Sequence, residues 1–180
     1  ISKKDIGNAD CIIHLASIAN DPAAELDASL TWDVNVLATF KIINLAIKQK
    51  IKKFIYASSG SVYGIKNEKK VTEDLSLEPI SEYNKSKMGS EQVLMGYRDR
   101  MKVQIVRPAT VCGISPRMRL DVTVNMLTMQ ALTNGKITVF GGTQIRPNIH
   151  IEDICDLYLF LLANPNICGI FNAGFENISI

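Results

Sequence analysis

A tyrosine and a lysine stand four residues apart in the segment Tyr83-Asn84-Lys85-Ser86-Lys87. On a helix, this spacing places both side chains on one face, about one turn from each other. A nearby ammonium group stabilises a phenolate, so the pKa of Tyr83 should fall from its ordinary value of about 10. A phenol of this kind can take a proton from an alcohol, or return it, during hydride transfer. The same spacing also occurs by chance on solvated helix faces, so it needs support from other residues.

Small polar residues supply that support in the segment Ser58-Ser59-Gly60-Ser61-Val62-Tyr63-Gly64, about 24 residues before the tyrosine. This segment follows an apolar run, and a hydroxyl at Ser59 could hydrogen-bond the same substrate oxygen that Tyr83 deprotonates. The alternative is a serine-rich turn stabilised by bonds from side chains to the backbone.

The segments around these residues alternate between the patterns of strands and helices. Continuous apolar runs predict strands at 11–16, 54–57 and 102–106, whereas helical spacing predicts helices at 28–50 and 81–97, the second with Ser81 as N-cap. This order predicts an α/β fold with a parallel sheet that is covered on both faces. Small polar residues follow the first two strands, where open α/β sheets bind ligands.

The pattern changes after Pro108. We expect a helix at 121–134, a short strand at 137–140, a strand that leads into a helix at 149–162, and a last strand at 170–171. This change predicts a boundary near residue 114 between two parts, residues 1–114 and 115–180.

The composition is that of a globular protein, with 47% apolar and 21% charged residues. A net charge of +2 does not indicate a nucleic acid or an anionic membrane as partner. No apolar run approaches the roughly 20 residues that cross a bilayer, so we expect a cytoplasmic protein. The four cysteines are widely spaced and three fall in apolar runs, which predicts buried free thiols at most of Cys11, Cys112, Cys155 and Cys168.

Several motifs in order resemble the extended short-chain dehydrogenase/reductases, in the NAD-dependent epimerase/dehydratase branch. The motifs are His14-Leu15-Ala16, Asn35, the segment 58–64, the segment 83–87, Arg107-Pro108 and Arg146-Pro147-Asn148-Ile149-His150. The resemblance runs from about Asp10 to Gly174, and its ordered agreement is far more specific than any single motif. It implies part of a doubly wound Rossmann-type NAD(P)-binding domain in residues 1–114, and part of a smaller α/β lobe for a nucleotide sugar in residues 115–180.

The resemblance also implies roles for individual residues. Ser59 would be the catalytic hydroxyl, Tyr83 the acid and base, and Lys87 its partner and a ligand of the cofactor ribose. The other implied cofactor contacts are His14, Leu15, Ala16, Asn35 and Pro108, and the cofactor would be NAD, with NADP left open. The implied substrate contacts, besides Ser59, are Ser61, Thr110, Asn125, Thr138, Phe140 and Arg146. The guanidinium fork of Arg146 also suits diphosphate oxygens on physical grounds.

Two departures from the family pattern shape the expected reaction. The Gly-rich turn that cradles a pyrophosphate is not in this sequence, so we expect a fragment that lacks both ends of the domain pair. Dehydratases of this branch carry an acidic residue just after the catalytic hydroxyl, where this chain has Gly60 and Ser61. Dehydration is therefore less favoured than epimerisation or keto-reduction. Thr110 and Cys112 also replace a common Asn and Tyr, so sugar contacts could differ.

The leading expectation is thus an epimerase that transiently oxidises a nucleotide-diphosphate sugar and that, when complete, forms a homodimer. A keto-reductase or dehydratase of the same family is the first alternative, and a non-catalytic dinucleotide-sensing protein is the second. We expect no metal, and we expect structural roles for His14 and His150, because no carboxylate cluster accompanies them.

Overall fold

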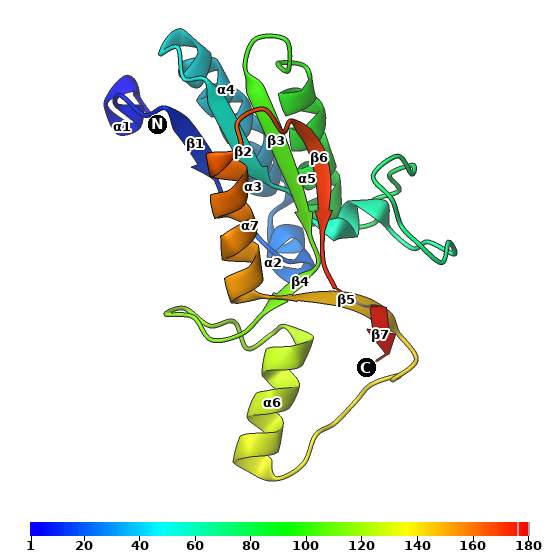
Figure 1. Ribbon diagram of the computed structural model, residues 1–180. Helices are drawn as coiled ribbons and strands as arrows, with labels where there is room; N and C mark the ends of the chain where they lie inside the picture. Colours follow the sequence, from blue (N-terminus) through cyan, green and yellow to red (C-terminus); the bar gives the residue numbers. More distant parts are fainter. Residues whose placement is uncertain (176, 180) are drawn as a thin grey trace.

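A parallel four-stranded sheet forms the centre of the molecule (Figure 1). The computed structural model describes residues 1–175 and 177–179. The sheet has the order β1-β2-β3-β6 and consists of β1 (Cys11–His14), β2 (Lys53–Ala57), β3 (Lys102–Pro108) and β6 (Gly169–Ala173). All neighbouring strands run parallel, so the predicted α/β fold with a parallel sheet is confirmed.

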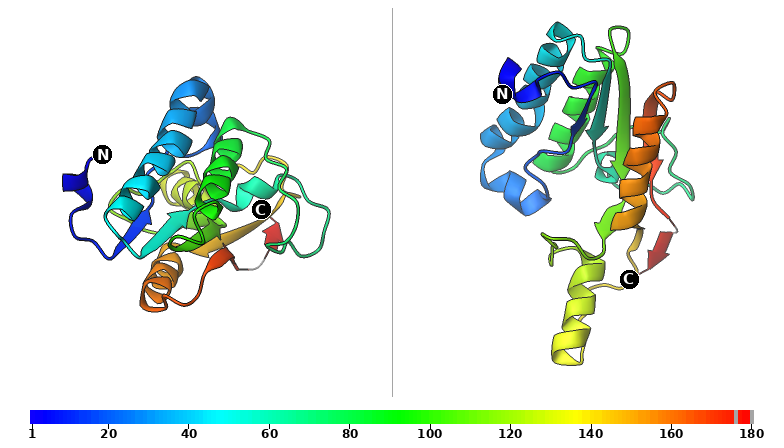
Figure 2. Two further views of the ribbon diagram at one scale, coloured as in Figure 1. Left: turned by 90° about the horizontal axis from the view of Figure 1, so that it is seen from above. Right: turned by 60° about the vertical axis from the view of Figure 1, so that its left-hand side comes forward.

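Helices cover both faces of this sheet (Figure 2). Side chains alternate along β2, so Phe54 and Tyr56 face one side while Ile55 faces the other. The first side packs against α4 (Ala38–Lys48) and α5 (Glu82–Met95), and the second against α7 (Ile151–Ala163). Burial of these apolar faces is the main force that holds the layers together.

The predicted helix at 28–50 is confirmed as one continuous helix with an unusual middle. It consists of α3 (Ala28–Trp32), the π-helical turn η1 (Asp33–Leu37) and α4, and Asp27 accepts a hydrogen bond from Leu30 N at its start. By length and composition alone, Ala28–Lys48 could cross a membrane, although the sequence was expected to hold no such segment. The helix buries polar Thr31, Asn35 and Thr39 in the described structure, and a core helix meets the same criteria of length and composition.

The helix that carries the Tyr83 motif begins where the sequence predicts. Ser81 is the N-cap of α5, and its hydroxyl accepts a hydrogen bond from Asn84 N at 3.2 Å. The preceding connections contain α2 (Asp21–Leu26) and the 3-10 turn η2 (Gly60–Tyr63). A short helix, α1 (Lys3–Ile6), precedes β1.

The part of the chain beyond β3 forms a second small sheet and an isolated helix. The strands β4 (Thr110–Cys112), β5 (Ile145–His150) and β7 (Asn177–Ser179) lie in the order β4-β5-β7, and α6 (Thr123–Asn134) extends away from both sheets (Figures 1 and 2). β6 returns from this part to pair with β3 in the first sheet. The predicted boundary near residue 114 remains a prediction.

The predicted strand at 137–140 is wrong. This segment is exposed and has no strand beside it among the described residues, so its backbone has no ladder to join. Instead, Thr138 N donates to the side chain of Gln130 at 2.9 Å. The apolar residues that suggested a strand remain on the surface, where Phe140 is 82% exposed.

The cysteines are free thiols, as expected, but they are not buried. Cys11 and Cys112 are half-buried, and Cys155 and Cys168 are exposed. Cys155 lies on α7, whose inner face is taken by Ile154 and Leu161. An apolar run on a surface helix therefore includes an outward-facing position, which explains the error at Cys155.

Candidate active site

The structure brings Ser59, Tyr83 and Lys87 together at the carboxyl end of the parallel strands. Ser59 follows β2 and is the N-cap of η2, while Tyr83 and Lys87 occupy the first two turns of α5. Lys87 Nζ lies 5.8 Å from the centre of the Tyr83 ring, and Ser59 is close enough to affect the ionisation of Tyr83. The arrangement matches the geometry that the sequence predicted.

Lys87 is one of the most buried charged residues of the described chain, with 2% of its surface exposed. Its Nζ donates to Ala57 O at 2.8 Å and lies 5.0 Å from the centre of the Tyr56 ring. Burial lowers the pKa of Lys87 to about 8, although the negative charge of Glu91 acts in the opposite direction. The ammonium group is therefore less firmly protonated than that of an ordinary lysine.

The predicted fall in the pKa of Tyr83 is wrong for this structure. Burial raises the pKa of the phenol above its ordinary value, and this effect outweighs the lowering effect of the Arg119 charge. Spacing on a helix could place the lysine, but it could not show how far the phenol would be removed from water. At neutral pH the phenol of Tyr83 is protonated.

The Ser59 hydroxyl belongs to a chain of hydrogen bonds. Its Oγ accepts from Ser61 N at 3.2 Å and lies 2.7 Å from Ser61 Oγ, which donates to Asn84 Oδ1 at 2.5 Å. The bond from Ser61 N is the one foreseen for a serine-rich turn, so Ser59 combines a structural role with its candidate catalytic role. Asn84 was not identified from the sequence, although it stands directly after Tyr83.

A buried ion pair holds the segment from Ser58 to Tyr63 in place. Arg107 Nη2 lies 2.6 Å from Glu91 Oε2, both side chains are 3% exposed, and Ser58 Oγ donates to the same carboxylate. Arg107 Nη1 also donates to the Tyr63 hydroxyl at 2.7 Å, at the far end of η2. Both ends of the segment that holds Ser59 are thus attached to one ion pair. Glu91 was not predicted from the sequence, although its place four residues after Lys87, on the same helix face, was a usable signal.

Asn35 connects the loop after β1 with α5. Its Oδ1 accepts from Ile18 N at 2.8 Å, and its Nδ2 donates to Ile18 O at 3.1 Å and to Ser86 Oγ at 2.8 Å. Asn35 therefore holds the loop after β1 against α5. Direct contact of Asn35 with a cofactor stays a prediction.

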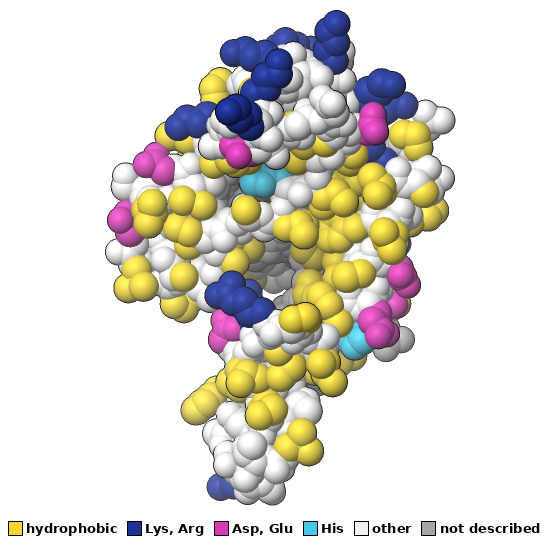
Figure 3. All heavy atoms as spheres, turned by 90° about the vertical axis from the view of Figure 1, so that its left-hand side faces the viewer, with side chains coloured by type: hydrophobic (Ala, Val, Ile, Leu, Met, Phe, Trp, Pro, Cys, Tyr) yellow, Lys and Arg dark blue, Asp and Glu magenta, His cyan; other side chains and the backbone are white. Residues whose placement is uncertain are grey.

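His14 ends β1 and is buried. Its Nε2 lies 3.0 Å from Thr39 Oγ1, and burial lowers the pKa of His14 to about 4, so the ring is neutral at pH 7. The following residues, Leu15 and Ala16, are exposed. Figure 3 shows that the face on this side of the molecule, where β1 is the edge strand, is hollowed near its middle between hydrophobic side chains.

These features fit a dinucleotide at this edge of the sheet. Leu15, directly after β1, is 57% exposed, and the buried Lys87 and half-buried Tyr83 lie near the carboxyl ends of the strands. Pro108 is half-buried at the end of β3, and its carbonyl oxygen would lie 3.2 Å from a Cβ placed on Gly60. The backbone there approaches closely because residue 60 has no side chain.

The predicted substrate contacts that follow Pro108 lie on separate segments of the chain. Thr110 is half-buried on β4, and Asn125 is buried, with its amide bound to Gly113 N and Arg119 O at 2.9 Å each. Asn125 therefore holds the loop before α6 in place. Thr138, Phe140 and Arg146 are exposed beyond α6. Their contacts with a substrate stay predictions.

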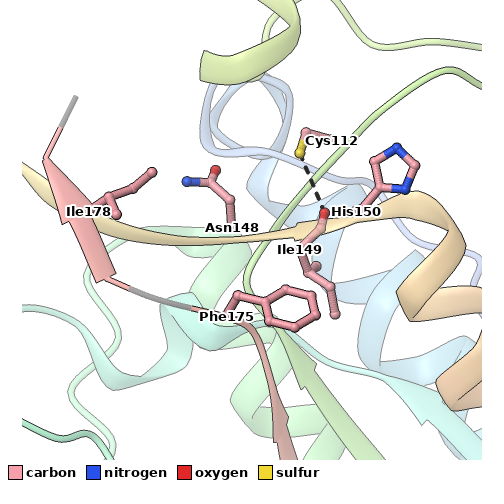
Figure 4. Close-up of a pocket in the computed structure, with 6 residues that line it drawn as sticks. All are labelled: Cys112, Asn148, Ile149, His150, Phe175 and Ile178. Atoms are coloured by element: carbon pink, nitrogen blue, oxygen red, sulfur yellow. Dashed lines mark hydrogen bonds between the residues drawn. The ribbon is translucent and has the colours of Figure 1, made fainter.

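A separate open hollow of about 360 Å³ lies between β4, β5 and β7. Its lining residues are Cys112, Asn148, Ile149, His150, Phe175 and Ile178 (Figure 4). His150 is the N-cap of α7 and accepts from Glu152 N at 3.4 Å, which is a structural role. Within residues 1–175 and 177–179, no three His, Cys, Asp or Glu side chains are grouped so that they could hold a metal ion.

Comparison with known proteins gives these features a context. The sequence profile of the NAD dependent epimerase/dehydratase family matches residues 3–174. The chain is 33% identical over 177 residues to an uncharacterized UDP-glucose epimerase of Bacillus subtilis, covering 95% of this chain and 55% of that protein.

Solved structures agree with this match. A UDP-glucuronic acid 4-epimerase from Bacillus cereus, solved with UDP-glucuronic acid and NAD, is similar with a TM-score of 0.86 and 31% identity, over 99% of this chain and 58% of that one. An NAD dependent NDP-hexosamine 5,6-dehydratase of tunicamycin biosynthesis is similar with a TM-score of 0.89 and 29% identity, over 99% and 59%. The chain thus spans a little more than half the length of these proteins.

Proposed function

Because the chain belongs to the NAD dependent epimerase/dehydratase family, we propose that it carries the catalytic residues for transient oxidation of a hydroxyl on a nucleotide-diphosphate sugar. The observation that carries this proposal is the convergence of Ser59, Tyr83 and Lys87 near the carboxyl ends of β1 and β2. We propose epimerisation as the outcome.

The roles of the side chains follow from their positions. Tyr83 takes the proton of the sugar hydroxyl and later returns it, while Ser59 holds the sugar oxygen by a hydrogen bond. Lys87 supplies a positive charge beside the phenol and can donate to ribose hydroxyls. Because burial raises the pKa of Tyr83, a further positive charge is needed to stabilise its phenolate at neutral pH.

NAD fits the open edge of the sheet, and it supplies the hydride acceptor when bound. His14 to Ala16, Tyr83, Lys87 and Pro108 are the residues of this chain that would hold it. NADP remains the alternative cofactor.

The turn after β2 supports epimerisation over dehydration. An acidic side chain at position 60 would begin with a Cβ only 3.2 Å from Pro108 O, which is tighter than ordinary contact. At position 61, the hydroxyl of Ser61 is bound to Asn84. Neither position offers a carboxyl group to assist the loss of water.

We also propose that the complete protein forms a homodimer in the cytoplasm. The helix Ala28–Lys48 exposes four large apolar side chains, Leu30, Trp32, Leu37 and Phe40, which are 37 to 49% exposed. A second copy could cover them, and Phe40→Lys should then shift the sedimentation of the protein towards the monomer. Free cysteines agree with a reducing compartment.

The test of the proposed function uses the complete gene product and a set of nucleotide sugars. Tyr83→Phe should reduce turnover by about 10³-fold, within the usual range for general acid and base groups, while NAD(H) binding is retained. Tyr97→Phe is the matched control and should keep full turnover, because it removes only a hydroxyl that donates to Asn44 of α4. Full turnover in Tyr83→Phe would exclude the proposed role.

Product analysis separates the rival functions. Cofactor returned unchanged with an inverted sugar carbon identifies the epimerase. Stoichiometric consumption of NAD(P)H identifies a keto-reductase, and loss of water identifies a dehydratase. NAD(H) binding without turnover of any sugar would identify a dinucleotide-sensing protein.

A further inference from the structure

The hydrogen bonds from Ser59 lead away from Tyr83 into the first turn of α5. Ser59 Oγ and Ser61 Oγ are 2.7 Å apart, and Ser61 Oγ is 2.5 Å from Asn84 Oδ1. Asn84 is 7% exposed, so this end of the chain is shielded from water. The position of Asn84 is fixed because its backbone nitrogen donates to Ser81 Oγ, which in turn donates to Asp21 Oδ1 at 2.6 Å.

The donors and acceptors in this chain have only one consistent direction. An amide oxygen can only accept, so Ser61 must give its single hydroxyl proton to Asn84. The proton between the two serines must then come from Ser59. Because Ser59 Oγ also accepts from Ser61 N at 3.2 Å, it has a lone pair left, but no proton, for a group on the Tyr83 side.

We propose that Asn84 is a positioning residue that acts through Ser61 and holds the Ser59 proton away from Tyr83. Ser59 is then a hydrogen-bond acceptor in the resting site and can accept from the protonated phenol. It becomes a donor only when its hydroxyl rotates towards a sugar oxygen, and the rotation exchanges one hydrogen bond for another without loss of a proton. The inference concerns the site of the proposed function and rests on it for its role in turnover.

A consequence is that Ser61 Oγ and the Tyr83 phenolate compete for one proton. If the amide of Asn84 is removed, Ser61 can instead donate to Ser59, and Ser59 can donate to the phenolate. A hydrogen bond to a charged group contributes about 1.5 kcal/mol or more, which corresponds to a fall of about one unit in the pKa of Tyr83. The charged groups that face the phenol are Lys87 on α5, Asp21 on α2 and Arg119 before α6, and none of them is changed.

The test is an NMR titration of the protein labelled with carbon-13 at the tyrosine ring, with Tyr83→Phe used to assign the signal. Asn84→Ala and Ser61→Ala should each lower the pKa of Tyr83 by about one unit, and the double variant should lower it no further. Asn84→Asp keeps an acceptor and adds a negative charge, so it should raise the pKa. Asn44→Ala, which removes a remote amide from α4, should leave it unchanged.

Unchanged pKa values in Asn84→Ala and Ser61→Ala, or shifts that add in the double variant, would overturn the inference. If one variant does not fold, the other still decides. The pH profile of kcat in the complete gene product provides a second readout, and its limb assigned to Tyr83 should move in the same directions.

The titration needs no substrate, so the two proposals can fail separately. The expected shifts together with full turnover in Tyr83→Phe would overturn the proposed function alone. Loss of turnover in Tyr83→Phe with no shift in the Asn84 and Ser61 variants would overturn the role of Asn84 alone.

Discussion

The two sheets of this molecule hold their functional candidates in contrasting ways. Around the four-stranded sheet, Ser59, Lys87 and Asn35 each have hydrogen-bond partners within the chain. Beyond α6, Phe140 and Arg146 are exposed. The difference shows that the part that would do chemistry is preorganised, whereas the part predicted to hold the nucleotide sugar leaves its side chains open to a ligand.

The largest effect of a single change should come from the buried ion pair behind Ser59. Glu91→Ala leaves the guanidinium of Arg107 buried without its carboxylate, which should lower the free energy of unfolding by about 3 to 5 kcal/mol. Urea denaturation measures the loss. The control is Glu82→Ala, which breaks the more exposed pair with Lys85 and should cost less than about 1 kcal/mol. Equal losses of unfolding free energy in the two variants would contradict the larger contribution expected of the buried pair.

A glycine at the end of η2 should have the next largest effect. Gly64 has a φ of +71°, and a Cβ there would lie 2.1 Å from Glu78 O, so the backbone must move to admit Gly64→Ala. We expect a loss of about 3 kcal/mol in the free energy of unfolding. Gly135→Ala has a similar φ of +61° but open space around it, and should cost only about 1 kcal/mol. If both variants lose the same free energy of unfolding, the positive φ alone explains the loss and the close contact with Glu78 O does not contribute.

The buried ammonium group of Lys87 should lower the free energy of unfolding at neutral pH. Its pKa in the folded protein is about 8, against an ordinary value of 10.5, so below pH 8 the fold carries the full cost of a buried ammonium. As the pH rises from 8 towards 10.5, the folded state releases this proton before the unfolded state does, and the cost disappears.

Lys87→Met should therefore be more stable than the native chain at pH 7, by about 2 kcal/mol after the lost bond to Ala57 O is counted. The advantage should shrink as the pH rises, and turnover should be lost. Thermal unfolding at several pH values measures it, with Lys85→Met as the exposed control. An advantage that does not change with pH would contradict this explanation.

The smallest effect on stability should come from the open region. Phe140 is 82% exposed, so Phe140→Ser should change the free energy of unfolding by less than about 0.5 kcal/mol. Its predicted contact with the substrate would appear only as weaker binding of the nucleotide sugar to the complete gene product, measured by calorimetry. Unchanged binding would remove Phe140 from the predicted substrate contacts.

The sequence predicted the features that depend on local pattern. Apolar runs located β1, β2 and β3, and the N-cap signal located the start of α5 at Ser81. The spacing of Tyr83 and Lys87 predicted their shared helix face. The second part was less predictable, because the run at 137–140 has the composition of a strand but no neighbouring strand, and pairing is a tertiary property.

The errors at the candidate site have a similar cause. The direction of the Tyr83 pKa shift depends on burial, which residue spacing does not report. Glu91 and Asn84 were missed because their importance arises from partners distant in the sequence, Arg107 and Ser61. A local motif identifies a catalytic group more readily than it identifies the residues that orient that group.

The wide turn η1 has a geometric consequence for the helix around it. Thr31, Asn35 and Thr39 are buried at successive intervals of four residues. In a regular α-helix each such interval advances by about 40° around the axis, so the three side chains would spiral by about 80° in all. A turn with i to i+5 bonds holds more residues and takes up part of this advance. The side chains of Thr31, Asn35 and Thr39 therefore lie more nearly in line along the helix. Through these three side chains the helix is hydrogen-bonded to α2, to α5 and to the end of β1.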